Sequence, residues 1–385
     1  MALALAFSAV AAPAMAQRQR VEPKPTRYAE LAVDEKTGKV LYERNAQHPV
    51  YPASTTKLMT AYLTFRALHD GRLHFDDMLK VSENAAFMPA TNLWMAEPST
   101  IKTVVKGKNG QKIVKFEKGP PEQTVFEIKT ETALRGMLCH SANDATVVFA
   151  EAIAGSTTEF VKEMNAQAQR LGMTNTHFSN TNGLPDVNNK TTVEDMSKLA
   201  RALIEDFPEY YKFFSIPSIT VRGHTARNTN HLLGVDPDVD GMKTGWIAMS
   251  GFNLVASAKR GDTRVIALVF GANTAEGRNS DMEHLLHFAF EKEKNPKARF
   301  TYGPNPPAGA AEREIAQTPQ DKHWPAPIVV AAPPPPAPVI PPSAPLLTLP
   351  LPATPDPLPP KGDTTLPVVI LPTRSNSNSG ARPPA

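Results

Sequence analysis

The chain has 385 residues and a formal charge of +3 at neutral pH, from 41 Lys and Arg against 38 Asp and Glu. This near balance, without a dense basic stripe, gives no indication of a nucleic-acid partner. Prolines divide the chain, since 24 of the 38 lie after residue 300. Residues 17–295 have a globular composition and can bury a large core, whereas we expect residues 296–385 to be a disordered Pro-rich tail.

Residues 1–16 have the pattern of a secretory signal peptide. Ala2 to Ala12 form an apolar run, and Ala14-Met15-Ala16 fits a cleavage site before Gln17. The usual basic start is missing, so either the true start lies upstream or the signal is atypical. This run is too short to span a bilayer, and no other segment reaches about 18 apolar residues. We therefore expect an exported, periplasmic chain without a transmembrane segment in its mature form, soluble or peripheral to the inner membrane.

The first elements along the chain follow from apolar spacing. Residues 28–45 predict a hairpin, because alternating apolar positions flank a turn. Residues 54–68 predict a helix with Ser54 at its N-terminal edge. Residues 98–126 are rich in lysine and contain an Asn109-Gly110 turn, which predicts an exposed hairpin inserted into the globular part.

An apolar helical region over residues 131–153 is interrupted by Ser141-Ala142-Asn143. Further elements follow in order: a helix opened by the capping pair Ser156 and Glu159, a loop over 180–190, a helix over 191–205, strands over 251–259 and 264–271, and a helix over 279–293. Helices thus flank late antiparallel strands, and we expect the first hairpin to join the same sheet. The pattern predicts an α/β (α+β) fold.

The first chemical motif is Ser54-Thr55-Thr56-Lys57, which places a hydroxyl and an amine one helical turn apart on one face. A serine hydroxyl becomes a good nucleophile when a base takes its proton. A lysine can be that base if burial and nearby positive charge lower its pKa. The helix N-terminus adds partial positive charge where an oxyanion would form. The alternative is an N-capping serine followed by a solvated lysine.

The second motif is Ser141-Ala142-Asn143, a polar interruption of an apolar helical region. If buried, these side chains must find hydrogen-bond partners. The Ser141 hydroxyl could pass protons between Lys57 and a leaving amine, and the Asn143 amide could hold a substrate backbone. The alternative is a helix break capped by Ser141.

The third motif is Lys243-Thr244-Gly245, at the start of the sheet-like region. Gly245 would let a substrate approach the strand backbone closely. Lys243 would add positive charge, and Thr244 would offer a hydroxyl to a carboxylate. The alternative is an ordinary strand edge that carries a lysine.

The three motifs in this order make the chain resemble the penicillin-recognising serine hydrolases, whose signature is S-x-x-K, S-x-N and K-T-G. It is most similar to the low-molecular-mass penicillin-binding proteins that are D-alanyl-D-alanine carboxypeptidases of serine peptidase family S11. The resemblance covers about residues 25–293 and includes the stretches YPASTTKLMTAYL, SANDATVVFAEAIAGS, NTNGLPD and DGMKTGWIAMSGFNLVASA. It implies a β-lactamase/DD-peptidase-like fold, with an antiparallel sheet flanked by helices.

The resemblance also implies an activity, the removal of the terminal D-alanine from peptidoglycan stem pentapeptides through a Ser54 acyl-enzyme, inhibited by β-lactams. Ser54 resembles the nucleophile, Lys57 its general base and Ser141 the proton carrier. The residues that resemble the substrate-binding set are Asn143, Lys243, Thr244, Gly245, Trp246 and Arg278. Among them Trp246 would share an oxyanion hole with Ser54 through their backbone N–H groups. Arg278 would hold the substrate carboxylate; its alternative is a solvated loop charge.

Other functions remain open at this point. A D,D-endopeptidase that cuts cross-links would use the same residues. A class A β-lactamase is less favoured, because the loop over 180–190 contains no glutamate. A non-catalytic wall-binding protein is also less favoured, because the catalytic set is intact. No metal or other cofactor is expected, since the ten histidines show no pairing suited to zinc.

The chain departs from the family after residue 293. Many relatives continue with a β-rich domain and a C-terminal amphipathic helix, whereas here prolines interrupt the tail and we expect no such helix. The partner of the tail is unknown. The insertion over 98–126 either rims the cleft and meets the acidic wall peptide or is only a solvated hairpin, which is the interpretation that the sequence favours.

Overall fold

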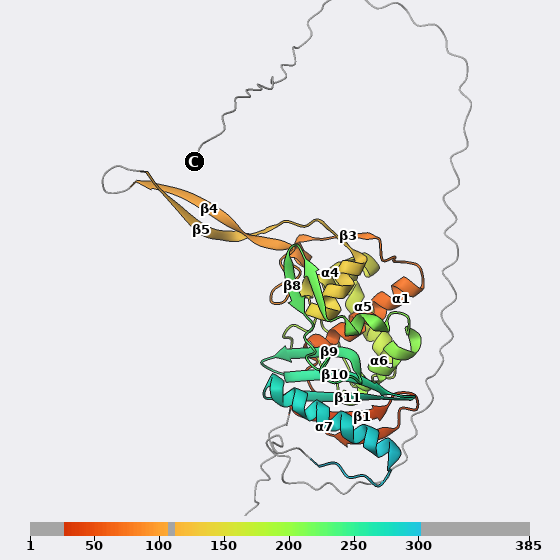
Figure 1. The fold of residues 1–385 in the computed structure, drawn as a ribbon. Helices are drawn as coiled ribbons and strands as arrows, with labels where there is room; N and C mark the ends of the chain where they lie inside the picture. Colours follow the sequence, from red (N-terminus) through yellow and green to blue (C-terminus); the bar gives the residue numbers. More distant parts are fainter. Residues whose placement is uncertain (1–26, 107–111, 302–385) are drawn as a thin grey trace, which may run out of the picture. The chain divides into compact units, whose positions relative to one another are not determined.

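The computed structural model of the protein describes residues 27–106 and 112–301 (Figure 1). The predicted signal peptide, the Asn109-Gly110 turn and nearly all of the Pro-rich tail lie outside these residues. Within the described part of the chain, no helix is both long and apolar enough to cross a bilayer.

A five-stranded antiparallel sheet forms the centre of the fold, in the order β2-β1-β11-β10-β9. Its strands are β1 (Ala29–Asp34), β2 (Val40–Arg44), β9 (Val239–Ile247), β10 (Gly251–Arg260) and β11 (Thr263–Ala272). β1 pairs with β11 from Ala29 opposite Phe270 to Asp34 opposite Val265. The prediction that the first hairpin joins the sheet of the late strands is confirmed.

Helices and short hairpins make up the rest of the body. The helices are η1 (Ala53–Thr56), α1 (Lys57–His69), α2 (Glu83–Ala86), α3 (Thr130–Arg135), η2 (Gly136–His140), α4 (Asn143–Ala154), α5 (Thr157–Arg170), α6 (Val193–Asp206), η3 (Tyr211–Ser215) and α7 (Ala275–Lys294). The short strand pairs are β3 (Met78–Lys80) with β6 (Glu127–Lys129) and β7 (Ser218–Val221) with β8 (His224–Arg227). These pairs were not predicted, because three or four residues carry too little alternation to identify a strand.

Both faces of the sheet are covered, which explains the nearly continuous apolar sequence of β11. Ile266 and Leu268 point to one face and join the core of α1, α4, α5 and α6. Val265 and Ala267 point to the other face and pack with the apolar side of α7. Figure 1 shows α7 on one side of the sheet and the remaining long helices on the opposite side.

One predicted helix start is confirmed by its cap, and another was wrong. Ser156 accepts a hydrogen bond from the Glu159 N–H at 3.2 Å and so opens α5. The interruption of the region 131–153 occurs where Ser141 adopts a φ of 67° between η2 and α4. The start predicted for the last helix, at 279, was wrong, because the Thr274 hydroxyl accepts from the Gly277 N–H and α7 begins earlier.

The predicted insertion is a hairpin of β4 (Ala96–Lys106) and β5 (Lys112–Gln123), which pair only with each other. Its ribbon runs away from the helices in Figure 1.

The loop before α6 packs tightly against the start of η1, and a glycine makes this contact possible. Gly183 has a φ of +86°, and a Cβ at this position would lie 1.8 Å from the carbonyl oxygen of Ala53. Gly172 also has a positive φ, but a Cβ there would meet open space. The backbone beside Ser54 is therefore held by a position that only glycine can occupy.

The matched substitutions Gly183→Ala and Gly172→Ala separate this contact from backbone strain alone. We expect Gly172→Ala to cost about 1–2 kcal/mol, which is the cost of a left-handed alanine. Gly183→Ala should cost at least about 4 kcal/mol, because a clash with backbone is added. Thermal unfolding followed by circular dichroism measures both, and equal melting temperatures would contradict the close packing.

Candidate active site

The 3-10 turn η1 brings Ser54 to the head of α1, one turn before Lys57. Ser54 Oγ and Lys57 Nζ lie 3.0 Å apart, and Lys57 is fully buried. The alternative of a solvated lysine is therefore wrong. The first motif forms a buried hydroxyl–amine pair at a helix N-terminus, where the dipole favours developing negative charge.

Two further acceptors surround the Lys57 amine, and they come from distant parts of the chain. Lys57 Nζ donates to Asn143 Oδ1 at 2.7 Å and to the carbonyl oxygen of Asn182 at 2.7 Å. A neutral amine has two N–H donors and one lone pair. With its two donors on Asn143 and Asn182, the lone pair of a neutral Lys57 is left for the Ser54 hydroxyl.

The surroundings of Lys57 favour the neutral amine. Burial lowers the pKa of Lys57 well below its usual value, and the positive charge of Lys243 lowers it further. Asp144 opposes this effect, but burial also raises the pKa of the Asp144 carboxyl to about 6. The backbone N–H groups of Leu93 and Ala145 donate to the Asp144 carboxylate at 2.6 and 2.8 Å. These hydrogen bonds favour the charged carboxylate and so oppose part of the rise in its pKa.

The second motif holds Asn143 in place through backbone contacts. The Asn143 side chain donates to the carbonyl of Pro89 at 2.9 Å, and its backbone N–H donates to the carbonyl of Thr91 at 2.8 Å. Ser141 is 7% exposed, and its hydroxyl has no hydrogen-bond partner among the described residues. The left-handed backbone of Ser141 ends η2 and leaves this hydroxyl available to a substrate.

The third motif lies on β9, directly against η1. A Cβ on Gly245 would lie 2.9 Å from the carbonyl oxygen of Pro52 and 3.0 Å from the backbone nitrogen of Ser54. Thr244 Oγ1 donates to Thr229 Oγ1 at 2.7 Å, and Lys243 Nζ donates to the carbonyl of Thr244 at 3.1 Å. The glycine therefore lets the strand edge approach the serine.

Arg278 lies in the first turn of α7 and is only 4% exposed, so the alternative of a solvated loop charge is wrong. Its guanidinium donates to Asn279 Oδ1 at 3.0 and 2.7 Å and to the carbonyl of Asn253 at 3.4 Å. Burial lowers the pKa of Arg278 to about 10, so the group stays charged at neutral pH. Burial, and then the charge of Arg278, lower the pKa of Lys243 to about 7.

Trp246 follows Gly245 on β9, and its side chain is 56% exposed beside the ring of Phe252 at 5.8 Å. Its backbone N–H belongs to the strand that lies against Ser54 at Gly245. The structure thus brings Ser54, Lys57 and Asn143 into direct contact and puts β9 against them.

Three residues of this arrangement were missed in the sequence. Asn182 supplies a carbonyl to Lys57, and Thr229 accepts from Thr244. Asn253 donates to the carbonyls of Tyr51 and Pro52 at 2.9 and 3.1 Å and so ties β10 to the start of η1. Asn182 had a weak signal, since it lies in the Asn-rich loop. Thr229 and Asn253 had none, because a lone polar side chain leaves no spacing pattern.

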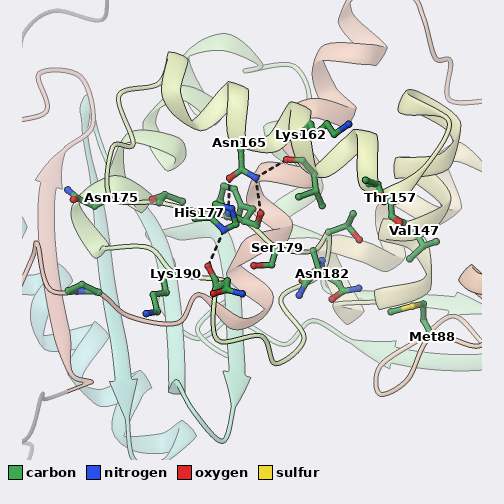
Figure 2. Close-up of a pocket in the computed structure, with 18 of the residues that line it drawn as sticks. Met88, Val147, Thr157, Lys162, Asn165, Asn175, His177, Ser179, Asn182 and Lys190 are labelled. Atoms are coloured by element: carbon green, nitrogen blue, oxygen red, sulfur yellow. Dashed lines mark hydrogen bonds between the residues drawn. The ribbon is translucent and has the colours of Figure 1, made fainter.

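A groove of about 1060 Å³ lies behind the loop that carries Asn182 (Figure 2). Figure 2 shows Asn165 and His177 on its wall, where the Asn165 side chain donates to the carbonyl of Phe178 at 2.8 Å. None of the predicted site residues lines this groove. The candidate active site is therefore not this groove but a narrow contact between η1, α4 and β9.

Comparisons with known proteins identify the family of the chain. The family model described as D-alanyl-D-alanine carboxypeptidase, peptidase S11, matches residues 17–109 and 121–274. This chain belongs to that family. The D-alanyl-D-alanine carboxypeptidases DacF of Bacillus subtilis and DacC of Escherichia coli are both 36% identical to it, over 68% and 72% of its length.

Solved structures of the family confirm the predicted fold class. Penicillin-binding protein 5 from Haemophilus influenzae is 32% identical, with a TM-score of 0.60 over 70% of this chain and 72% of that one. The ampicillin-bound penicillin-binding protein D2 from Listeria monocytogenes is 30% identical, with a TM-score of 0.57 over 69% of this chain and 98% of that one. The match to DacF and DacC spans 61% and 64% of their lengths, which is less than two thirds of each.

The substitution Lys243→Met tests how the neighbouring charge acts on Lys57. Because Lys243 lowers the pKa of Lys57, its removal should raise that pKa, while burial keeps it below the usual lysine value. Nuclear magnetic resonance titration of lysines labelled at Cε measures this shift directly. Lys259→Met, at an exposed position of β10, is the matched control and should leave the Lys57 titration unchanged. An unshifted Lys57 in Lys243→Met would show that the two amines are not coupled.

Proposed function

We propose that this protein is a serine-type D-Ala-D-Ala carboxypeptidase that removes the terminal D-alanine from peptidoglycan stem pentapeptides. The observation that carries the proposal is the 3.0 Å contact between Ser54 Oγ and a buried Lys57 amine whose other partners are both acceptors. That arrangement supplies a nucleophile together with its base. The family membership supports the same reaction.

In the first step, neutral Lys57 takes the Ser54 proton while Ser54 Oγ attacks the carbonyl carbon of the penultimate D-alanine. The carbonyl oxygen becomes an oxyanion, and the backbone N–H groups of Ser54 and Trp246 stabilise it. The close approach of Gly245 to the Ser54 nitrogen supports this assignment, since it puts the two segments side by side.

In the second step, the C–N bond breaks and the proton on Lys57 passes through the Ser141 hydroxyl to the leaving amine of D-alanine. An unpartnered hydroxyl on Ser141 suits this relay. Water then attacks the Ser54 ester, giving up a proton to Lys57, and the shortened peptide leaves with a free carboxylate. Ser54 regains its proton, so the enzyme is restored.

The substrate carboxylate lies beside Thr244 in this proposal, near the charges of Lys243 and Arg278. A buried guanidinium whose charge is kept at neutral pH suits a carboxylate better than a solvated one, because less water must be displaced. The Asn143 amide, which Lys57 and Pro89 orient, holds the peptide backbone.

β-lactams would acylate Ser54 in place of the peptide, because their ring amide presents a similar carbonyl. The Listeria relative is described in ampicillin-bound form. The substrate is wall peptide, so we place the enzyme outside the cytoplasmic membrane, in the periplasm.

The substitution Ser54→Ala tests the nucleophile. We expect release of D-alanine from a pentapeptide muropeptide, followed by mass spectrometry, to fall by at least about 10⁴-fold. Ser156→Ala is the matched control, since it removes the cap of α5 and should cost about 1 kcal/mol of stability with little effect on turnover. Full D-alanine release by Ser54→Ala would overturn the proposal.

A cross-linked muropeptide dimer in the same assay identifies the scissile bond. The carboxypeptidase proposal predicts that the terminal D-alanine is trimmed and the cross-link stays intact. Conversion of dimers into monomers would instead make the enzyme an endopeptidase. If Ser54→Ala then abolished this conversion as well as D-alanine release, Ser54 would still be the nucleophile.

The substitution Arg278→Ala tests carboxylate binding. We expect KM for a peptide with a free C-terminal carboxylate to rise about 10- to 100-fold, because a hydrogen bond between charged groups is lost. Arg278→Lys should retain part of the affinity. A peptide with an amidated C-terminus should bind Arg278→Ala and the unmodified protein equally. A similar loss for both peptides would mean that Arg278 acts only through the fold.

A further inference from the structure

The β4–β5 hairpin is only partly matched by the family model. The family model matches up to residue 109 and resumes at residue 121, so the greater part of β5 lies outside it. Neither strand pairs with any other strand of the described residues. A two-stranded hairpin alone is only marginally stable in water. Such a segment gains stability if one of its faces is covered by a partner.

One face of the hairpin combines lysines with exposed apolar side chains. Cross-strand pairing puts Lys102 opposite Phe116, Val104 opposite Val114, and Thr100 opposite Lys118. Because side chains alternate between the faces of a strand, these residues share one face with Lys106. This surface, the basic–apolar face, consists of Thr100, Lys102, Val104, Lys106, Val114, Phe116 and Lys118.

Every side chain of the basic–apolar face is open to solvent. Phe116 is 68% exposed, Val104 53% and Val114 42%. The face contains no acidic residue, and among the described residues no carboxylate lies within ion-pair distance of its lysines. An exposed phenylalanine between unpaired cations leaves apolar surface in water and positive charge without a counter-charge.

The opposite face of the hairpin is different. It carries Glu117 beside Lys115, so its charges are mixed, and its Ile101, which is 47% exposed, lies over Gly119. At the base of the hairpin, Glu97 forms an ion pair with Arg222 at 3.0 Å, which attaches β4 to the turn between β7 and β8. The base is thus joined to the body while the basic–apolar face remains uncovered.

We propose that the basic–apolar face binds the surface of an anionic phospholipid bilayer. Lipid headgroups supply the negative charge that Lys102, Lys106 and Lys118 lack, and the layer beneath them takes up Phe116 and Val104. A hydrophilic polyanion such as an acidic wall polymer would neutralise the lysines but leave Phe116 in water. The combination of charge and apolar exposure therefore favours a lipid surface.

The electrostatic attraction of the lysines and the insertion of apolar side chains together make binding to the bilayer reversible and dependent on salt. Each lysine held near an anionic bilayer strengthens binding about fivefold, and the attraction extends over about 8 Å at physiological salt. Three lysines then contribute about a hundredfold, to which insertion of Phe116 adds. The bilayer contact would hold the described body of the protein at a membrane surface.

Vesicle flotation of the full-length chain tests the proposal at about 0.15 M salt. The probes are vesicles of phosphatidylglycerol with phosphatidylethanolamine, vesicles of phosphatidylcholine alone, and purified wall sacculi. We expect binding to the anionic vesicles only. The combined substitutions Lys102→Gln, Lys106→Gln and Lys118→Gln should weaken it about a hundredfold. Phe116→Ser should weaken it about tenfold.

Substitutions on the opposite face are the matched controls. Lys115→Gln and Ile101→Ser should change binding less than about twofold, since their side chains point away from the bilayer. Thermal unfolding of every variant shows that the body is intact. Equal binding by all variants, or no binding of the unmodified chain, would overturn the proposal. Binding to sacculi that is lost with the three lysines would assign the face to a wall polymer instead.

Discussion

The arrangement of the active site depends on one buried amine. Lys57 cannot reach water, so its nitrogen must find all its partners inside the protein, and it finds them on η1, α4 and the loop at Asn182. These three segments are therefore tied together by the amine that also contacts the Ser54 hydroxyl. Burial is costly for a charged amine, so it lowers the pKa of Lys57. The neutral amine, the form that can act as a base, is thereby favoured.

Two glycines let the surrounding backbone come close enough to complete the site. Gly183 sits against Ala53, and Gly245 sits against the Ser54 nitrogen, so both the loop and the strand approach the backbone of η1 closely. Arg278 and Lys243 are both buried on the side of β9, where each lowers the pKa of the next amine toward Ser54. The same positive charges that would attract a carboxylate therefore also favour a neutral Lys57.

The hairpin of β4 and β5 differs from the body in how its apolar side chains are placed. The body buries its apolar side chains between a sheet and helices, whereas the hairpin exposes Phe116 and Val104 beside lysines and has no layer to cover them. Its base is attached through Glu97 and Arg222, close to the segment that leads to Ser141. A surface contact there would orient the chain without altering the residues around Ser54.

The sequence alone determined the fold class, the order of the helices and late strands, and the candidate chemistry of Ser54, Lys57 and Arg278. It did so because helical spacing, caps and short motifs are local patterns. The tertiary structure alone decided that Lys57 is buried and that Asn182 and Asn253 take part. It also decided that the charged insertion has one uniformly basic and apolar face. These features depend on contacts between distant segments and on strand register, and neither leaves a signal in the order of the residues.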